Sequence, residues 1–130
     1  MSWPEVYLVL LVSHITGDFI LQTEWQALNK RGGLGRNRES RRALRDHGLT
    51  YTLACLPGLI WMAAERHDAL PVLLALLITL PHVIVDDGTL VRSWMRRVKH
   101  TPDPAPGLMI MVDQSFHLVL LLPVALLAVV

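Results

Sequence analysis

The chain has 130 residues, of which 52% are hydrophobic and 18% are charged. A single soluble domain of this size and composition would expose too much apolar surface to water, so the composition argues for a lipid-facing surface. The net charge of +1 conceals an uneven distribution, because the charged residues crowd into two stretches and are nearly absent from the long apolar ones. We therefore expect the lipid bilayer as a partner, and no nucleic acid.

Four apolar stretches are each expected to cross the hydrocarbon core of a bilayer, which takes about 20 residues of helix. They cover approximately residues 3–25, 47–64, 70–87 and 108–130. Only residues 65–69 separate the second stretch from the third, so these two are expected to form an antiparallel hairpin. The expected fold is all-α, a polytopic bundle of four transmembrane helices forming a single domain over residues 1–130.

Basic residues indicate the side of the membrane on which each loop lies, because cytoplasmic loops are enriched in Lys and Arg. The two basic stretches contain Lys30, Arg31, Arg36, Arg38, Arg41, Arg42 and Arg45, and then Arg92, Arg96, Arg97 and Lys99. The connection between the second and third apolar stretches holds only Arg66. Both termini of this multi-pass protein are therefore expected on the outer side.

Ionisable residues lie within the apolar stretches, where a charged side chain costs about 2.5–3.5 kcal/mol at the helix centre and so needs partners. Three His/Asp pairs have a spacing of four residues, which places both members of each pair on one helical face. The pairs are His14 with Asp18, His82 with Asp86, and Asp113 with His117, and His47 opens the second apolar stretch.

The predicted topology brings these residues to a common depth. The first and third stretches run inward and carry their pairs late, whereas the second and fourth run outward and carry theirs early. Because the spans were chosen without using the pairs, this agreement is an independent observation. We expect all seven side chains to converge inside the membrane near its cytoplasmic face.

Histidine and carboxylate ligands one helical turn apart can bind the same metal ion, as in helical zinc and di-iron sites. The combination of imidazoles and carboxylates favours a divalent ion, zinc first with manganese or iron as alternatives, over calcium or copper(I). The predicted metal ligands are His14, Asp18, His47, His82, Asp86, Asp113 and His117.

Roles within and around this set can also be assigned from the sequence. His47 is expected as a ligand or a general base, and His47 and Asp18 are the catalytic candidates. Gln22 and Gln114 are expected to orient ligands or to make interhelical hydrogen bonds, because metal-bound histidines and carboxylates need such support. Asp87 is either a boundary charge or an additional ligand.

Four segments carry these residues: His14-Ile-Thr-Gly-Asp18-Phe-Ile-Leu-Gln22-Thr, His47, His82-Val-Ile-Val-Asp86 and Asp113-Gln114-Ser-Phe-His117. Their combination resembles an uncharacterised bacterial membrane family, the domain of unknown function 3307 type, over nearly the whole chain. The resemblance implies a compact four-helix protein of the bacterial inner membrane without a known activity. The pattern is also distantly similar to inner-membrane metal-dependent hydrolases, an analogy between sites.

The leading hypothesis is a metal-dependent hydrolase that acts on a lipid-linked or membrane-proximal substrate, because a bound metal lowers the pKa of water. In an alternative hypothesis, the protein is a transporter and the same cluster passes protons or divalent metal ions across the membrane. Such a path needs access from both sides of the membrane. A homo-oligomer could supply that access. In a structural membrane protein, the polar core would only fix helix packing.

Overall fold

The computed structural model describes residues 1–66 and 70–130, and within these residues all regular structure is helical. The elements are α1 (Trp3–Ile15), the π-helical segment η1 (Thr16–Leu21), α2 (Glu24–Asn29), α3 (Arg38–Arg66), α4 (Leu70–Asp86), α5 (Thr89–Arg97) and α6 (Pro106–Leu127). The all-α prediction is confirmed. Residues 67–69, which belong to the expected link between the second and third apolar stretches, lie outside the described residues.

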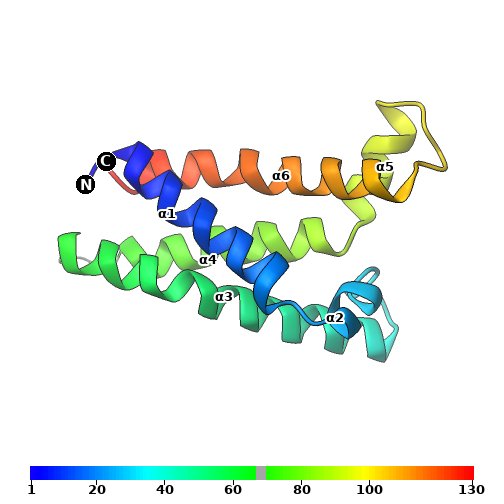
Figure 1. Ribbon diagram of the computed structural model, residues 1–130, viewed down its shortest axis with the longest axis horizontal. Helices are drawn as coiled ribbons and strands as arrows, with labels where there is room; N and C mark the ends of the chain where they lie inside the picture. Colours follow the sequence, from blue (N-terminus) through cyan, green and yellow to red (C-terminus); the bar gives the residue numbers. More distant parts are fainter. Residues whose placement is uncertain (67–69) are drawn as a thin grey trace.

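The four long helices pack in a ring, in which α1 contacts α3 and α6, and α4 also contacts α3 and α6. Both termini lie at one end of this bundle, and α2 and α5 lie at the other (Figure 1). The bundle interior toward the termini is an apolar core that includes Val6, Leu10, Met62, Leu74 and Ala125. This core closes one end of the bundle.

Within the described residues, two helical stretches are long and apolar enough to cross a membrane, Trp3–Leu21, formed by α1 and η1, and α6. A third emerges only if α4 and α5, which are bent by 60° at a short break, count as one span. Large apolar side chains also cover the outside of the bundle, including Leu8, Val72 and Val119, each more than half exposed. Of the four expected transmembrane helices, only the first and the fourth are therefore confirmed, within the described residues, as long and apolar enough to cross a membrane on their own.

The two middle helices fall short for different physical reasons. α4 has 17 residues and is therefore roughly 26 Å long, less than the ~30 Å hydrocarbon core. α3 has 29 residues and begins at Arg38, well before the expected start at His47. Its N-terminal part is charged, and the part that follows contains polar residues such as Thr50 and Thr52, so no stretch of α3 within the described residues is apolar enough to count as a span.

The first span also ends earlier than expected, at Leu21 and not near Trp25. Gln22 is extended (φ −65°, ψ 125°), and the short helix α2 follows. Thr23 starts α2 with a capping box, in which Thr23 Oγ1 accepts a hydrogen bond from the Gln26 backbone N–H and the Gln26 side chain accepts one from the Thr23 N–H. The helices α2 and α5 were not predicted.

Close packing holds η1 against α3 at Gly17. A Cβ atom at this position would lie 2.7 Å from Tyr51 Cδ2 and 3.3 Å from Tyr51 Cα. Only glycine therefore allows η1 to approach α3 this closely, and the approach sets the position of the next residue, Asp18.

We predict that Gly17→Ala destabilises the protein by about 1–3 kcal/mol, because the added methyl group overpacks the contact with Tyr51. Thermal unfolding of the purified protein in detergent measures the effect. Gly107→Ala is the control, since a Cβ there meets nothing within 4 Å. Equal unfolding midpoints for the two variants would show that the contact between η1 and α3 is not tight.

Candidate metal centre

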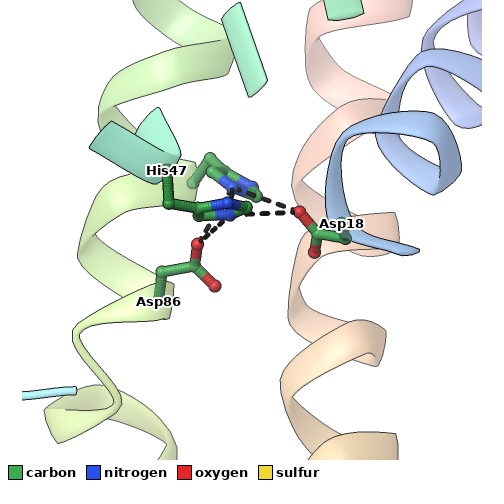
Figure 2. A group of neighbouring side chains, drawn as sticks. Asp18, His47 and Asp86 are labelled. Atoms are coloured by element: carbon green, nitrogen blue, oxygen red, sulfur yellow. Dashed lines mark hydrogen bonds and ion pairs between the residues drawn. The ribbon is translucent and has the colours of Figure 1, made fainter. Parts of the chain in front are cut away.

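Four side chains from three helical elements point their ligand atoms at one another. They are Asp18 from η1, His47 from α3, and His82 and Asp86 from α4. Figure 2 shows the ring of His47 between the carboxylates of Asp18 and Asp86. We call these four residues the tetrad. All four are buried, with at most 6% of each residue exposed.

The distances within the tetrad resemble the edges of a coordination polyhedron. His47 Nε2 lies 3.1 Å from His82 Nε2, 2.8 Å from Asp86 Oδ2 and 3.3 Å from Asp18 Oδ1. His82 Nε2 lies 3.0 Å from Asp86 Oδ2 and 3.4 Å from Asp18 Oδ1. Two ligands of a tetrahedral zinc ion, each about 2.0–2.2 Å from the metal, are themselves about 3.3–3.6 Å apart. The tetrad is thus slightly tighter than a metal-filled site.

Hydrogen bonding accounts for only part of this convergence, the contact between His47 Nε2 and His82 Nε2. Asp18 Oδ1 and Asp86 Oδ2 are fully buried, yet neither has a hydrogen-bond partner of acceptable geometry among the described residues. Buried carboxylate oxygens normally accept hydrogen bonds or bind metal ions. The donor set, two imidazoles and two carboxylates, fits a divalent transition metal.

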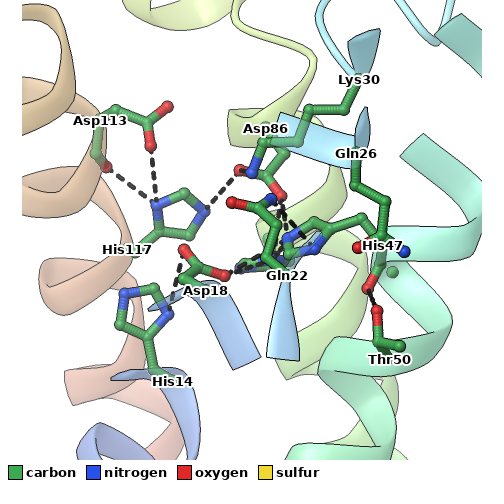
Figure 3. Close-up of polar contacts among 12 residues, drawn as sticks. His14, Asp18, Gln22, Gln26, Lys30, His47, Thr50, Asp86, Asp113 and His117 are labelled. Atoms are coloured by element: carbon green, nitrogen blue, oxygen red, sulfur yellow. Dashed lines mark hydrogen bonds and ion pairs between the residues drawn. The ribbon is translucent and has the colours of Figure 1, made fainter. Parts of the chain in front are cut away.

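The other three expected residues border the tetrad (Figure 3). His14 Nδ1 lies 3.8 Å from Asp18 Oδ2, and His117 Nε2 lies 3.7 Å from Asp86 Oδ1. The Asp113 carboxylate lies 3.6 Å from His117 Nδ1 and is the most exposed group of the cluster. The structure therefore brings all seven predicted residues together, His14, Asp18, His47, His82, Asp86, Asp113 and His117.

The two glutamines contact the cluster in the way an orienting residue would. In the amide orientation that satisfies its neighbours, Gln22 Oε1 accepts hydrogen bonds from His47 Nδ1 (3.1 Å) and Lys30 Nζ (2.7 Å). Gln114 Oε1 accepts one from His14 Nε2 (2.9 Å), and Gln114 Nε2 donates one to Asp18 Oδ2 (3.1 Å). Gln22 reaches His47 from the extended segment that follows η1.

Two residues at the cluster were missed by the sequence analysis. Lys30 Nζ donates a hydrogen bond to Asp86 Oδ1 at 2.8 Å, although Lys30 was assigned to a basic loop. The Tyr51 ring stacks on His82, with the ring centroids 3.4 Å apart. The spacing of Tyr51 four residues after His47 was a signal for a shared helical face. For Lys30 the sequence offered none.

Asp87 belongs to the adjoining loop and not to the cluster. Its Oδ1 accepts a hydrogen bond from the Leu34 backbone N–H at 2.8 Å, and its Oδ2 accepts one from Thr89 Oγ1. Its backbone carbonyl accepts another from the Gly32 N–H at 2.8 Å. Of the two roles expected for Asp87, this geometry supports the boundary charge, because Asp87 ties the loop after α2 to the start of α5.

A cavity of about 390 Å³ reaches the cluster from the α2 side. Asp18, Asp86, Asp113 and the two glutamines form its polar wall. Lys30 and Arg31 supply positive charge, and the apolar side chains lining it include Phe19, Leu28 and Ile110, each at least half exposed on the outer surface. The cavity is within the size range of small-molecule sites.

Comparison with known protein families assigns the chain to one of them. The family described as "Protein of unknown function (DUF3307)" matches residues 6–130, so the chain belongs to this family. The family expected from the combined motifs is therefore confirmed. No curated protein and no solved structure matches the chain.

We predict that Gln22→Leu lowers the affinity for Zn²⁺ by about 10–100-fold, because His47 loses the partner that orients its ring. Competition with a chelating dye measures the affinity of the purified protein. Asn29→Leu is the matched control, since the Asn29 amide hydrogen-bonds the Trp25 backbone carbonyl away from the cluster. An unchanged affinity in Gln22→Leu would mean that His47 does not bind the metal.

Proposed function

We propose that this member of the DUF3307 family is a membrane-embedded, metal-dependent hydrolase. The observation that carries the proposal is the tetrad, in which four buried nitrogen and oxygen atoms converge at 2.8–3.4 Å and two carboxylate oxygens lack hydrogen bonds to any described residue. Buried ionisable groups in an apolar helical protein are costly and are usually retained for function.

The proposed setting is a bacterial inner membrane crossed by all four long helices. In this arrangement the basic end of the bundle, which carries α2 and α5, faces the cytoplasm, and both termini lie outside. The location of the termini at the opposite end from α2 and α5 supports it (Figure 1). The charged first half of α3 would then project from the membrane into the cytoplasm, as basic cytoplasmic segments do.

Asp18, His47, His82 and Asp86 would hold the metal, and zinc is the first choice, with manganese or iron as alternatives. An ion bound there would lower the pKa of coordinated water and would polarise an oxygen of the substrate. His47 and Asp18 act in this scheme as ligands, because their atoms converge on the tetrad centre. We assign the role of general base to Asp113, which lines the cavity.

The cavity supports an anionic amphiphile as the substrate class. Lys30 and Arg31 suit a phosphate, whereas the exposed apolar rim formed by Phe19, Leu28 and Ile110 suits acyl chains within the bilayer. We therefore propose a lipid phosphoester. In its hydrolysis the oxygen of water bonds to phosphorus, the phosphorus–oxygen bond to the alcohol breaks, and Asp113 takes the proton of water and returns it to the departing alcohol oxygen.

Neither alternative has comparable support. A transport path would have to cross the half of the bundle toward the termini, which is filled by the apolar core around Leu10, Leu74 and Leu121. A purely structural polar core would be expected to satisfy its buried oxygens by hydrogen bonds, and Asp18 Oδ1 and Asp86 Oδ2 have none within the described residues.

We predict that the zinc-loaded protein hydrolyses phosphatidic acid in mixed micelles and that Asp113→Asn lowers the rate about 10²–10⁴-fold, the usual contribution of a general base. Release of inorganic phosphate measures turnover, and metal analysis of the same samples should give equal metal in both proteins. Asp103→Asn, a change at an exposed loop carboxylate, is the control and should retain the wild-type rate.

Two outcomes would contradict parts of this proposal. Absence of turnover for lipid phosphate monoesters and diesters, despite bound metal, would remove the lipid phosphoester as substrate. A normal rate in Asp113→Asn would remove Asp113 from the reaction.

A further inference from the structure

Two histidines beside the tetrad, His14 and His117, each have a buried ring nitrogen without a hydrogen bond to any described residue. His14 comes from α1 and His117 from α6. His14 is 1% exposed and His117 is 3% exposed. His14 Nδ1 and His117 Nε2 have no hydrogen-bond partner among the described residues.

The hydrogen bond made by the other nitrogen of each ring determines the tautomer. His117 Nδ1 lies 2.9 Å from the backbone carbonyl oxygen of Asp113, which can only accept, so Nδ1 carries the proton. His14 Nε2 likewise donates to Gln114 Oε1 at 2.9 Å, and Gln114 Nε2 donates to Asp18 Oδ2, which sets the orientation of the amide. In its neutral form each ring therefore presents an unprotonated nitrogen to the cluster, as metal-binding histidines do.

The carboxylates of the tetrad present their second oxygens to these nitrogens. Asp18 offers Oδ1 to the tetrad and holds Oδ2 3.8 Å from His14 Nδ1. Asp86 offers Oδ2 to the tetrad and holds Oδ1 3.7 Å from His117 Nε2. The two imidazoles are stacked, with their centroids 5.0 Å apart. Ligand atoms of His14, Asp18 and His117 all lie within 4.8 Å of one another, and Asp86 Oδ1 reaches this group through His117 Nε2. Ligands on opposite sides of one ion, each about 2.0–2.2 Å away, are up to about 4.4 Å apart, so a small inward movement of these side chains would let them share an ion.

We infer that His14, His117, Asp18 and Asp86 form a second divalent-metal site, so that the two carboxylates bridge a dinuclear centre. The inference rests on the proposed function, because the tetrad is the first of the two sites. Bridged pairs of this kind hold their ions about 3.5–4 Å apart and clamp the attacking and departing oxygens of a phosphoester. The cavity lined by Asp18, Asp86 and Gln114 gives a substrate access to this pair.

Lys30 is compatible with this arrangement. Its ammonium group donates to Asp86 Oδ1, the oxygen that faces His117, at 2.8 Å. A carboxylate oxygen has two lone pairs, so Asp86 Oδ1 can accept from Lys30 and bind an ion on the His117 side. Lys30 then acts as a positioning residue for the bridging carboxylate.

The test counts the metal ions in the full chain, purified in detergent, stripped of metal and reloaded with Mn²⁺. Elemental analysis after gel filtration gives ions per chain, and electron paramagnetic resonance of the same samples distinguishes an isolated Mn²⁺ from a carboxylate-bridged pair, whose spins couple at about 3.5–4 Å. We expect two ions and a coupled spectrum for the wild type. His117→Ala should hold one ion with an uncoupled spectrum, and the control His100→Ala, at an exposed loop histidine, should hold two.

The possible failures are distinguishable. One ion per wild-type chain with an uncoupled spectrum overturns the second site and leaves the tetrad intact. No bound ion overturns the proposed function together with this inference. If His117→Ala does not fold, the wild-type spectrum alone decides between a coupled pair and an isolated ion.

Discussion

The carboxylates of Asp18 and Asp86 are buried inside an apolar helical bundle, and the arrangement around them follows from the cost of that burial. An ionised carboxylate removed from water needs opposite charge and hydrogen bonds in return. Lys30 is the only lysine or arginine side chain in contact with either group within the described residues, and it reaches only Asp86 Oδ1. One buried ammonium group does not balance two carboxylates, so the remaining positive charge comes either from protons on the paired histidines His47 and His82 or from a metal ion. A divalent ion at the tetrad would supply the missing charge.

The backbone of the helical elements places the side chains of the tetrad close together. The π-helical segment η1 sets Asp18 against α3, and Gly17 removes the side chain that would keep the two apart. Such segments are rare and frequently occur at functional sites. Asp86 ends α4, where the chain turns at Gly88 (φ 77°) and lets the loop after α2 approach. Irregular backbone is thus found around the cluster, while the described residues in the half of the bundle toward the termini include the apolar core around Leu10 and Leu74.

Much of this site could be predicted from the sequence, because a spacing of four residues places His82 with Asp86, and Asp113 with His117, on common helical faces whatever the packing. The common depth of the pairs followed from the direction of each helix. Contacts made by irregular backbone could not be predicted in this way. Lys30 reaches Asp86 only because the chain leaves the helix at Gln22 and folds back through α2. The start of α3 was also missed, since its charged first half lacks an apolar signal.

X-ray absorption spectroscopy of the zinc-loaded protein tests the central claim, that the tetrad binds a metal ion, most directly. A zinc ion held by the tetrad should give a first shell of nitrogen and oxygen at about 2.0–2.1 Å, with the outer-shell scattering of imidazole rings. Asp18→Ala and His82→Ala should each reduce the bound zinc and change this spectrum. A hydrated ion without imidazole scattering, or wild-type zinc content and an unchanged spectrum in both variants, would contradict it.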